Sequence, residues 1–184
     1  TLMFHSSLDI FKISKSDLKY SINFLKKKFC KKIGISIYDP TELKRVYRYF
    51  KPDIVQCPLN LFDTRIYDSG WMSKIKERGA EIHVRSVFLQ GLLLSNKENL
   101  SKKFLKYLNF FKKLEKFSAR MHKSKLQICL NNIKYYKKKI DYLVIGVQNL
   151  KQLEEIYFFY KKKNKFEFIE FKNVPKKLYD PRLW

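Results

Sequence analysis

Five short apolar runs are spaced along this chain, and each one stops at a small or polar residue before a stretch with helical spacing. The runs cover residues 2–4, 33–35, 54–55, 82–84 and 142–145, and they end at His5, Ser36, Gln56, Arg85 with Ser86, and Gly146. This alternation predicts repeated βα units, whose helical connections make the strands parallel. Parallel strands end at a common edge, so we expect the chemistry of the protein at the residues that follow these runs.

Two architectures fit five βα units: an open doubly wound sheet and part of a (βα)8 barrel. The chain has only five glycines, and none of them forms the Gly-rich phosphate-binding patterns of open nucleotide-binding sheets. A barrel can instead bind a phosphorylated cofactor with the loops after its last two strands. We therefore expect an α/β fold, an incomplete (βα)8 TIM barrel of about five units, as a single domain over residues 1–184. The chain starts inside the first run and without methionine, so we expect the N-terminal strands to lie outside this sequence.

The spacing of apolar and turn-forming residues also predicts the individual elements. The expected strands cover residues 2–5, 33–38, 54–57, 81–86 and 142–146. Helices are expected after Ser14 or Ser16, from Asp39-Pro40 to about residue 50, over 69–78 before Gly79, from about 102, from about 119, and over 149–163. Residues 58–68 are expected to form a loop with an exposed centre. Residues 87–100 form a long loop of the kind that often carries function.

The formal charge of +23 raises nucleic acid as a partner, but two details argue against it. Only seven of the 40 basic residues are arginine, the side chain that most often reads bases. The lysines are spread along every expected helix instead of lining one of them. We therefore expect no specific nucleic-acid binding, only a salt-sensitive association with polyanions.

Membrane, metal and disulfide chemistry are each disfavoured by the composition. No apolar stretch approaches the roughly 18–20 residues of a membrane span, and no signal peptide is visible, so we expect a cytoplasmic protein without a membrane partner. Cys30, Cys57 and Cys129 lie far apart, which favours reduced and mostly buried thiols. The three histidines lack the spacing of zinc ligands, so we expect no metal.

Five blocks of the sequence resemble the C-terminal five-eighths of the aldo/keto reductase barrel. They cover residues 2–5, 33–38, 55–60, 84–93 and 144–155, in the order of strands four to eight of that family. The resemblance implies hydride transfer between NADPH, or in some members NADH, and a small-molecule aldehyde or ketone, without a metal. The expected function is thus an NAD(P)H-dependent oxidoreductase that reduces a carbonyl to an alcohol.

The resemblance assigns the catalytic histidine of the family to His5. A neutral imidazole at a strand end can donate a hydrogen bond to the substrate carbonyl and polarise it. The family's catalytic tyrosine, lysine and aspartate belong to strands before residue 1. We therefore expect the chain alone to be inactive.

The resemblance places the nicotinamide end of the cofactor at Ser36, Gln56 and Arg85. A hydroxyl and a side-chain amide suit the carboxamide, which has one acceptor oxygen and two donor hydrogens. Family members often have asparagine after that serine, where this chain has Ile37. Arg85 stands where relatives place an aromatic ring against the nicotinamide; a guanidinium can also stack, and the rival interpretation is a salt bridge to a neighbouring carboxylate.

The phosphates and the adenosine are assigned by the resemblance to two later segments. Their expected cofactor contacts are Ser86, Leu89, Gly91, Gly146, Val147, Gln148, Asn149, Gln152 and Glu155. Gln90 either contacts phosphate or faces solvent. NADPH is expected over NADH, but relatives that prefer NADPH often have Lys or Arg near position 148, so Gln148 leaves that choice open. Asn60 is expected to bind substrate, while Phe62 either reaches that pocket or packs in the core.

Two other hypotheses remain beside the oxidoreductase. One is a non-catalytic half-barrel that binds nucleotide weakly or pairs with another chain, and the other is a basic module that binds polyanions or nucleic acid. A five-stranded fragment leaves open strand edges, so we also expect self-association along them. Salt separates the hypotheses, since polyanion binding falls steeply with ionic strength and pocket binding falls less.

Overall fold

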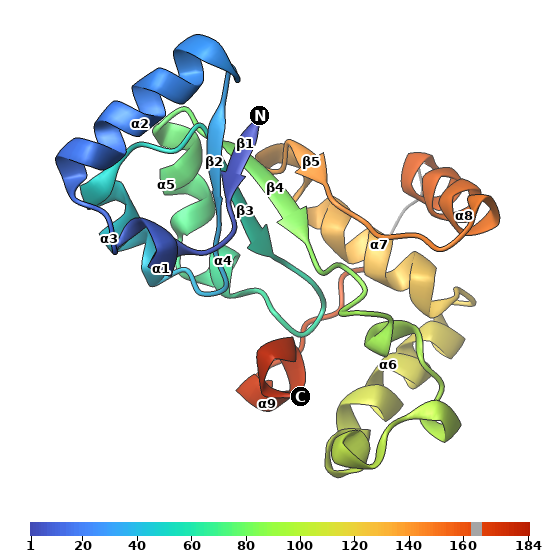
Figure 1. Ribbon diagram of the computed structural model, residues 1–184. Coiled ribbons are helices and arrows are strands. Elements are labelled where there is room, and N and C mark those ends of the chain that lie inside the picture. Colours follow the sequence, from blue (N-terminus) through green and yellow to red (C-terminus); the bar gives the residue numbers. More distant parts are fainter. Residues whose placement is uncertain (163–166) are drawn as a thin grey trace. The chain divides into compact units, whose positions relative to one another are not determined.

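The computed structural model describes residues 1–162 and 167–184, which form two compact units (Figure 1). The sheet unit contains residues Thr1–Pro58, Arg65–Arg85 and Lys139–Val144. The helical unit contains Leu59–Thr64, Ser86–Lys138 and the described part of Ile145–Trp184.

The sheet unit holds one parallel sheet whose strands lie in chain order. The strands are β1 (Leu2–Phe4), β2 (Ile33–Ser36), β3 (Ile54–Pro58), β4 (Glu81–Arg85) and β5 (Tyr142–Leu143). In a doubly wound sheet the spatial order of the strands reverses at a switch point, whereas a (βα)8 barrel adds each strand beside the previous one. The order β1-β2-β3-β4-β5 is therefore that of part of a (βα)8 barrel, as expected from the sequence. β2 and β5 end earlier than predicted, at Ser36 and Leu143.

Five helices belong to the sheet unit, and Figure 1 shows them gathered beside β1 to β4. They are α1 (Ser7–Ile10), α2 (Lys15–Lys28), α3 (Glu42–Tyr49), α4 (Arg65–Asp68) and α5 (Trp71–Glu77). Ser14 caps α2 by accepting the Asp17 N–H, which decides between the two predicted caps. The helix predicted over 69–78 is α5, which begins at Trp71 after Gly70 at a left-handed φ of 72°. Helix α4 lies instead in the loop that was predicted over 58–68. Gly79, at φ 76°, ends α5 in the left-handed conformation that was expected.

The prediction that a helix opens at Asp39-Pro40 is wrong by two residues. The Asp39 carboxylate accepts from the Thr41 N–H at 3.0 Å and from its hydroxyl at 2.7 Å, which makes a turn before the helix. Helix α3 then begins at Glu42, whose carboxylate accepts from the Tyr38 and Asp39 N–H groups.

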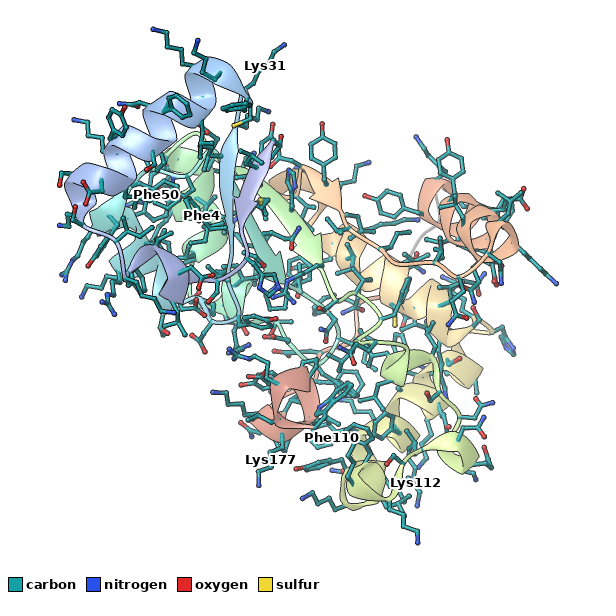
Figure 2. All side chains as sticks on the ribbon, viewed as in Figure 1. Phe4, Lys31, Phe50, Phe110, Lys112 and Lys177 are labelled. Atoms are coloured by element: carbon teal, nitrogen blue, oxygen red, sulfur yellow. The ribbon has the colours of Figure 1, made fainter. Side chains whose placement is uncertain are left out.

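The sheet packs through alternating positions of its strands. Ile82 and Val84 of β4 are fully buried, while Glu81, His83 and Arg85 are partly exposed, the period-2 pattern of a strand. Aromatic contacts join the strands to the helices, as where the ring of Phe4 meets that of Phe50 edge-on at 5.7 Å (Figure 2). Most lysines lie outside these contacts, and Figure 2 shows Lys31 pointing away from the chain.

One buried polar side-chain atom of the sheet unit has no hydrogen-bond partner among the described residues. The Tyr47 hydroxyl makes no hydrogen bond with the described residues, while its ring stacks on that of Trp71 with centroids 5.9 Å apart. Burial raises the pKa of Tyr47, and the nearby Arg78 opposes that rise.

Replacing Tyr47 with phenylalanine is expected to raise the free energy of unfolding by about 1 kcal/mol, because the ring stays and an unsatisfied buried hydroxyl goes. Urea unfolding measures the difference. Tyr20→Phe is the control, since Tyr20 is 74% exposed and should show no change. A less stable Tyr47→Phe protein would mean that the hydroxyl is hydrogen-bonded in solution.

The helical unit contains the remaining α-helices. They are α6 (Leu108–Arg120), α7 (Lys125–Tyr135), α8 (Leu150–Lys161) and α9 (Lys176–Tyr179). Short 3-10 helices cover Leu92–Leu94, Lys97–Asn99, Lys102–Tyr107 and Pro181–Leu183, and another, Lys137–Lys139, bridges α7 and β5. Their core is a cluster of leucines and phenylalanines that includes Leu89, Leu93, Phe111, Leu114 and Leu178.

Two predictions in the helical unit need correction, and a third cannot be compared with the described residues. The second helix after residue 101 starts at Lys125 and not near Ala119, because Ser124 and Gln127 form a capping box there. Residues 59–63 are buried and not exposed, with Leu61, Phe62 and Asp63 all at 3% exposure or less. The predicted end of the last helix at residue 163 lies outside the described residues, and α8 is described to Lys161.

Three further features of the described residues concern membrane spans, metal ligands and thiols. Over 1–162 and 167–184, no helix combines the length and apolar character that crossing a membrane requires. The same residues contain no group of three or more His, Cys, Asp or Glu side chains arranged to hold a metal ion. The cysteines are free thiols, with Cys57 and Cys129 buried. Burial raises the pKa of Cys129 to about 12, so this thiol stays neutral.

Candidate cofactor-binding site

In the sheet unit, four predicted site residues lie on consecutive strands, three of them at or just after the carboxyl end and Gln56 in the middle of its strand. His5 follows β1, Ser36 ends β2, Gln56 is in β3 and Arg85 ends β4. The pairing of Phe4 with Ile35 and of Ser36 with Gln56 places the first three at one level of the sheet. His5 is exposed, as a group that donates to a substrate must be.

Ser36 and Gln56 lie close enough to act together. The Ser36 hydroxyl donates to Gln56 Oε1 at 3.4 Å, a long hydrogen bond at the limit of the usual range. Ser36 is nearly buried and Gln56 is partly exposed. This leaves the Gln56 NH2 group as a donor for a carboxamide oxygen, while the Ser36 oxygen can accept from a carboxamide N–H. The pair therefore fits the polar part of a nicotinamide.

Ile37 does not take part in this polar pair. Its side chain is fully buried, and its N–H donates to the Gln56 carbonyl at 2.9 Å.

Arg85 is held by the segment that follows β2. Its NH2 group donates to the Ile37 carbonyl at 3.1 Å, and its Cζ atom lies 4.4 Å from the centroid of the Tyr38 ring. The stacking partner of Arg85 within the chain is thus a tyrosine that the sequence analysis did not single out.

The same segment is fixed by a network of charged groups. Arg65 donates from NH2 to the Tyr38 carbonyl at 3.0 Å and from NH1 to the Asp39 carboxylate at 2.6 Å. Glu42 accepts from the Tyr38 N–H at 3.1 Å and from the Ser7 hydroxyl. The sequence analysis assigned Asp39 to a helix start and gave Arg65 no role. Nothing in the local pattern signals these contacts, because Arg65 is 26 residues from Asp39.

In the helical unit, the loop after β4 has an unusual backbone. Ser86, Leu89 and Gln90 have φ values of 60°, 49° and 54°, and Gly91 follows at 84°. Left-handed conformations cost of order 1–3 kcal/mol in non-glycine residues, and they concentrate at functional sites. Leu89 is fully buried, so only its backbone is available to a ligand, whereas Gln90 is exposed. This geometry fits the loop that the resemblance assigns to the pyrophosphate.

Asn60 supports that loop from within the helical unit. Its NH2 group donates to the Ser86 carbonyl at 3.1 Å, and its Oδ1 atom accepts from the Phe62 N–H at 2.9 Å. Asn60 is 3% exposed, so these structural contacts account for most of its polar capacity, and substrate binding by Asn60 stays a prediction. The Phe62 ring meets those of Phe111 and Phe171 at 5.7 and 5.0 Å, which is core packing.

The start of α8 presents exposed polar groups. Asn149 caps the helix by accepting the Gln152 N–H at 3.0 Å, and Gln152 Oε1 accepts the Gln148 N–H at 2.9 Å. Both side chains keep NH2 groups that can donate to an anion beside the helix N-terminus. Gly146, Val147 and Glu155 are exposed in the same segment. A Cβ on Gly146 would meet no described residue within 4 Å, so packing against residues 1–162 and 167–184 does not require glycine there.

This chain matches a known protein family. The family model for the aldo/keto reductases matches residues 25–173. The chain belongs to the aldo/keto reductase family. No curated protein sequence matches it.

Solved aldo/keto reductases share the fold of this chain at low sequence identity. An enzyme from Bacillus halodurans in its apo form has a TM-score of 0.61 and 14% identity over 84% of this chain and 58% of its own. The glycerol dehydrogenase from Gluconobacter oxydans has a TM-score of 0.57 and 16% identity, covering 91% of this chain and 62% of its own. An aldo/keto reductase from Brucella melitensis has a TM-score of 0.56 and 16% identity, covering 90% of this chain and 56% of its own. The chain thus spans little more than half the length of these relatives.

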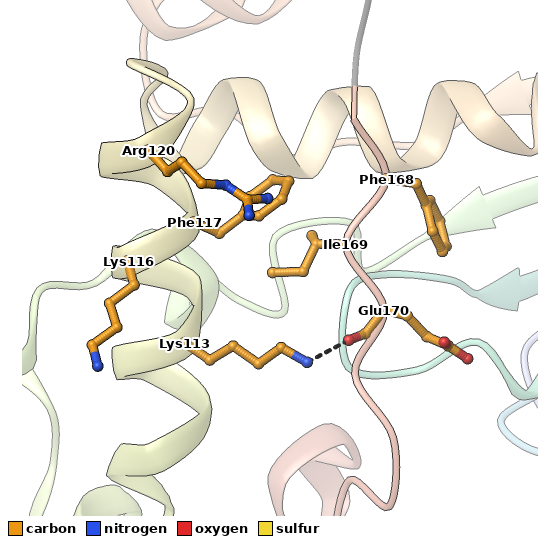
Figure 3. Close-up of a pocket in the computed structure, with 7 residues that line it drawn as sticks. All are labelled: Lys113, Lys116, Phe117, Arg120, Phe168, Ile169 and Glu170. Carbon is orange, nitrogen blue, oxygen red and sulfur yellow. Dashed lines mark hydrogen bonds between the residues drawn. The ribbon is translucent and has the colours of Figure 1, made fainter.

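A basic pocket of this aldo/keto reductase chain lies outside the predicted cofactor contacts. In the helical unit, Lys113, Lys116, Phe117 and Arg120 of α6 face an extended segment with Phe168, Ile169 and Glu170, around a volume of about 370 Å³ (Figure 3). Lys113 donates to the Glu170 carbonyl at 2.7 Å. Arg120 pairs with Glu167 at 3.0 Å.

Proposed function

We propose that residues 1–184 are a single-domain C-terminal portion of an aldo/keto reductase barrel and carry most of its cofactor contacts. The reaction is the NAD(P)H-dependent reduction of an aldehyde or ketone to an alcohol, without a metal. The observation that carries the proposal is the Ser36–Gln56 pair at the strand ends, whose donors and acceptors match a carboxamide. Such a protein would act in the cytoplasm.

The remaining contacts follow the resemblance. Arg85 would lie against the nicotinamide and His5 would donate to the substrate carbonyl, with Asn60 as a further substrate contact. The cofactor phosphates and adenosine would take Ser86, Leu89, Gly91, Gly146, Val147, Gln148, Asn149, Gln152 and Glu155. The cofactor supplies the hydride, and NADPH is preferred over NADH in this proposal.

Binding of NADPH, followed through the fluorescence of its reduced nicotinamide, tests the proposal directly. Gln56→Ala is expected to weaken binding about fivefold, because one net hydrogen bond contributes about 1 kcal/mol. His5→Ala should leave the affinity within about twofold, because His5 is assigned to the substrate and not to the cofactor.

Lys112→Gln is the matched control, since this lysine points outward from α6 (Figure 2) and is assigned no cofactor contact. A wild-type protein that does not bind NADPH would contradict the proposal. In that case the half-barrel that pairs with another chain becomes the better hypothesis. The coding sequence upstream of Thr1 then decides whether tyrosine, lysine and aspartate complete the site.

A second candidate function is the binding of polyanions. The basic pocket on α6 and the net charge of +23 favour it. Its signature is an affinity for heparin that falls steeply between low and moderate salt. Loss of that affinity in a Lys113→Gln, Lys116→Gln protein, with NADPH binding unchanged, would separate the two functions.

A further inference from the structure

We infer that Arg85, whose guanidinium lies over the Tyr38 ring, makes a cationic surface that selects the reduced, neutral nicotinamide over the oxidised, positively charged one. Arg85 is then the residue that determines specificity, and Tyr38 is its positioning residue. The inference rests on the proposed function, because it concerns the nicotinamide end of that site.

Two contacts fix the position of the Arg85 guanidinium. Its Cζ atom lies 4.4 Å from the centroid of the Tyr38 ring, within the range of a cation–π contact. Its NH2 group donates to the Ile37 carbonyl at 3.1 Å, which ties the charged group to the segment after β2. The positive charge is thus held at the end of β4, beside the segment that carries Ser36.

Tyr38 is itself immobilised through its backbone. Its N–H donates to Glu42 at 3.1 Å, and its carbonyl accepts from Arg65 at 3.0 Å. The carboxylate of Asp39 pairs with Arg65 at 2.6 Å, so the charge of Arg65 has a close partner. The preceding residue, Ile37, donates to the Gln56 carbonyl. The surface and the carboxamide pair thus share one short segment, residues 36–38.

The charge of Arg85 changes what this surface prefers. A neutral aromatic ring at this position would stack on either redox state. A guanidinium repels the positive ring of NADP+ but not the neutral ring of NADPH. Two unit charges about 4 Å apart in water-like surroundings repel by enough for roughly a fivefold difference in affinity. Every other part of the cofactor is the same in both forms, so the change in the ratio of the two dissociation constants on removal of the Arg85 charge isolates this effect.

The test compares NADPH and NADP+ binding by calorimetry in the wild type and three variants. The wild type is expected to favour NADPH about fivefold. Arg85→Phe should bring the ratio near one, because the ring restores stacking without the charge. Tyr38→Leu should weaken NADPH binding and lower the ratio, while Tyr38→Phe keeps the ring and should behave like the wild type.

Each outcome has one meaning. A ratio near one in the wild type, or a ratio that Arg85→Phe leaves unchanged, overturns the inference and leaves the proposed function standing. Absence of binding of both cofactors to the wild type overturns both. If Arg85→Phe does not fold, the wild-type ratio at 20 mM and 500 mM salt replaces it: screening should lower the ratio, and a constant ratio contradicts the inference.

Discussion

Replacement of Gly34 by alanine is expected to destabilise the protein by about 2–3 kcal/mol, the typical cost of forcing a group into a packed core. A Cβ at this position of β2 would lie 2.4 Å from Met3 Sδ, 2.9 Å from Ile54 Cβ and 3.0 Å from the Ile54 carbonyl oxygen. The methionine can turn away, but Ile54 cannot. Its backbone is in β3, and its register with Gly34 is fixed by the parallel ladder.

Gly146→Ala is the matched control for this substitution. A Cβ there meets nothing within 4 Å, and the residue is not in the left-handed conformation. Its substitution should therefore be neutral or stabilise by a few tenths of a kcal/mol through the unfolded state. Urea unfolding of both proteins measures the difference. Equal stabilities would mean that β1 and β3 do not flank β2 as closely as the structure shows.

Replacement of Asp141 by alanine is expected to cost about 1–2 kcal/mol at neutral pH. Its carboxylate accepts the Ile82 N–H of β4 at 2.7 Å and pairs with Lys76 of α5 at 2.8 Å. Asp53 repeats the arrangement before β3, accepting the Ile33 N–H at 2.8 Å and pairing with Lys26 at 2.6 Å. Asp141→Asn keeps an acceptor for the N–H and loses only a partly exposed ion pair, so it should cost less than about 1 kcal/mol.

The effect of Asp141 should also depend on pH. Burial opposes its ionisation, but the Lys76 ammonium and the Ile82 N–H outweigh that effect and lower the pKa of Asp141 below the usual 3.8. A lowered pKa in the folded state means that the stabilisation is complete above the unfolded pKa and is lost as the pH falls through the folded one. The difference between wild type and Asp141→Ala should therefore shrink below about pH 4. A difference that is constant from pH 7 to pH 2 would contradict this assignment.

The strands and their order could be predicted because each strand is a local apolar run. The end of each run at a polar residue predicted His5, Ser36 and Gln56 at strand ends. His5 and Ser36 do lie there, whereas β3 continues to Pro58, and Ser36 pairs with Gln56 in the parallel ladder. Helix boundaries were predicted less well where a side chain elsewhere in the sequence controls them. The start of α3 at Glu42 depends on a turn made by Asp39, and the same Asp39 is held by Arg65.

The candidate site also has features that the sequence could not predict. The left-handed loop after β4 contains only one glycine, so its conformation at Ser86, Leu89 and Gln90 has no local sequence signal. Burial of residues 59–63 also escaped prediction, because an Asn-Leu-Phe-Asp segment between two elements has the composition of an exposed loop. In the structure, Asn60 accepts from two N–H groups and donates to the Ser86 carbonyl. These hydrogen bonds offset the cost of burying the polar groups of that segment.

By itself, the sequence determined the βα repeat, the polar residues at the strand ends and the family of this chain, since all three are written in local periodicity and short blocks. Tertiary structure decided which of those residues meet. The contact of Arg85 with Tyr38 and Ile37 spans nearly 50 positions, from 37 to 85, and only the register of the sheet brings the two segments together. Pairwise contacts of this kind depend on backbone geometry across several strands, which no local pattern of hydrophobic and polar residues contains.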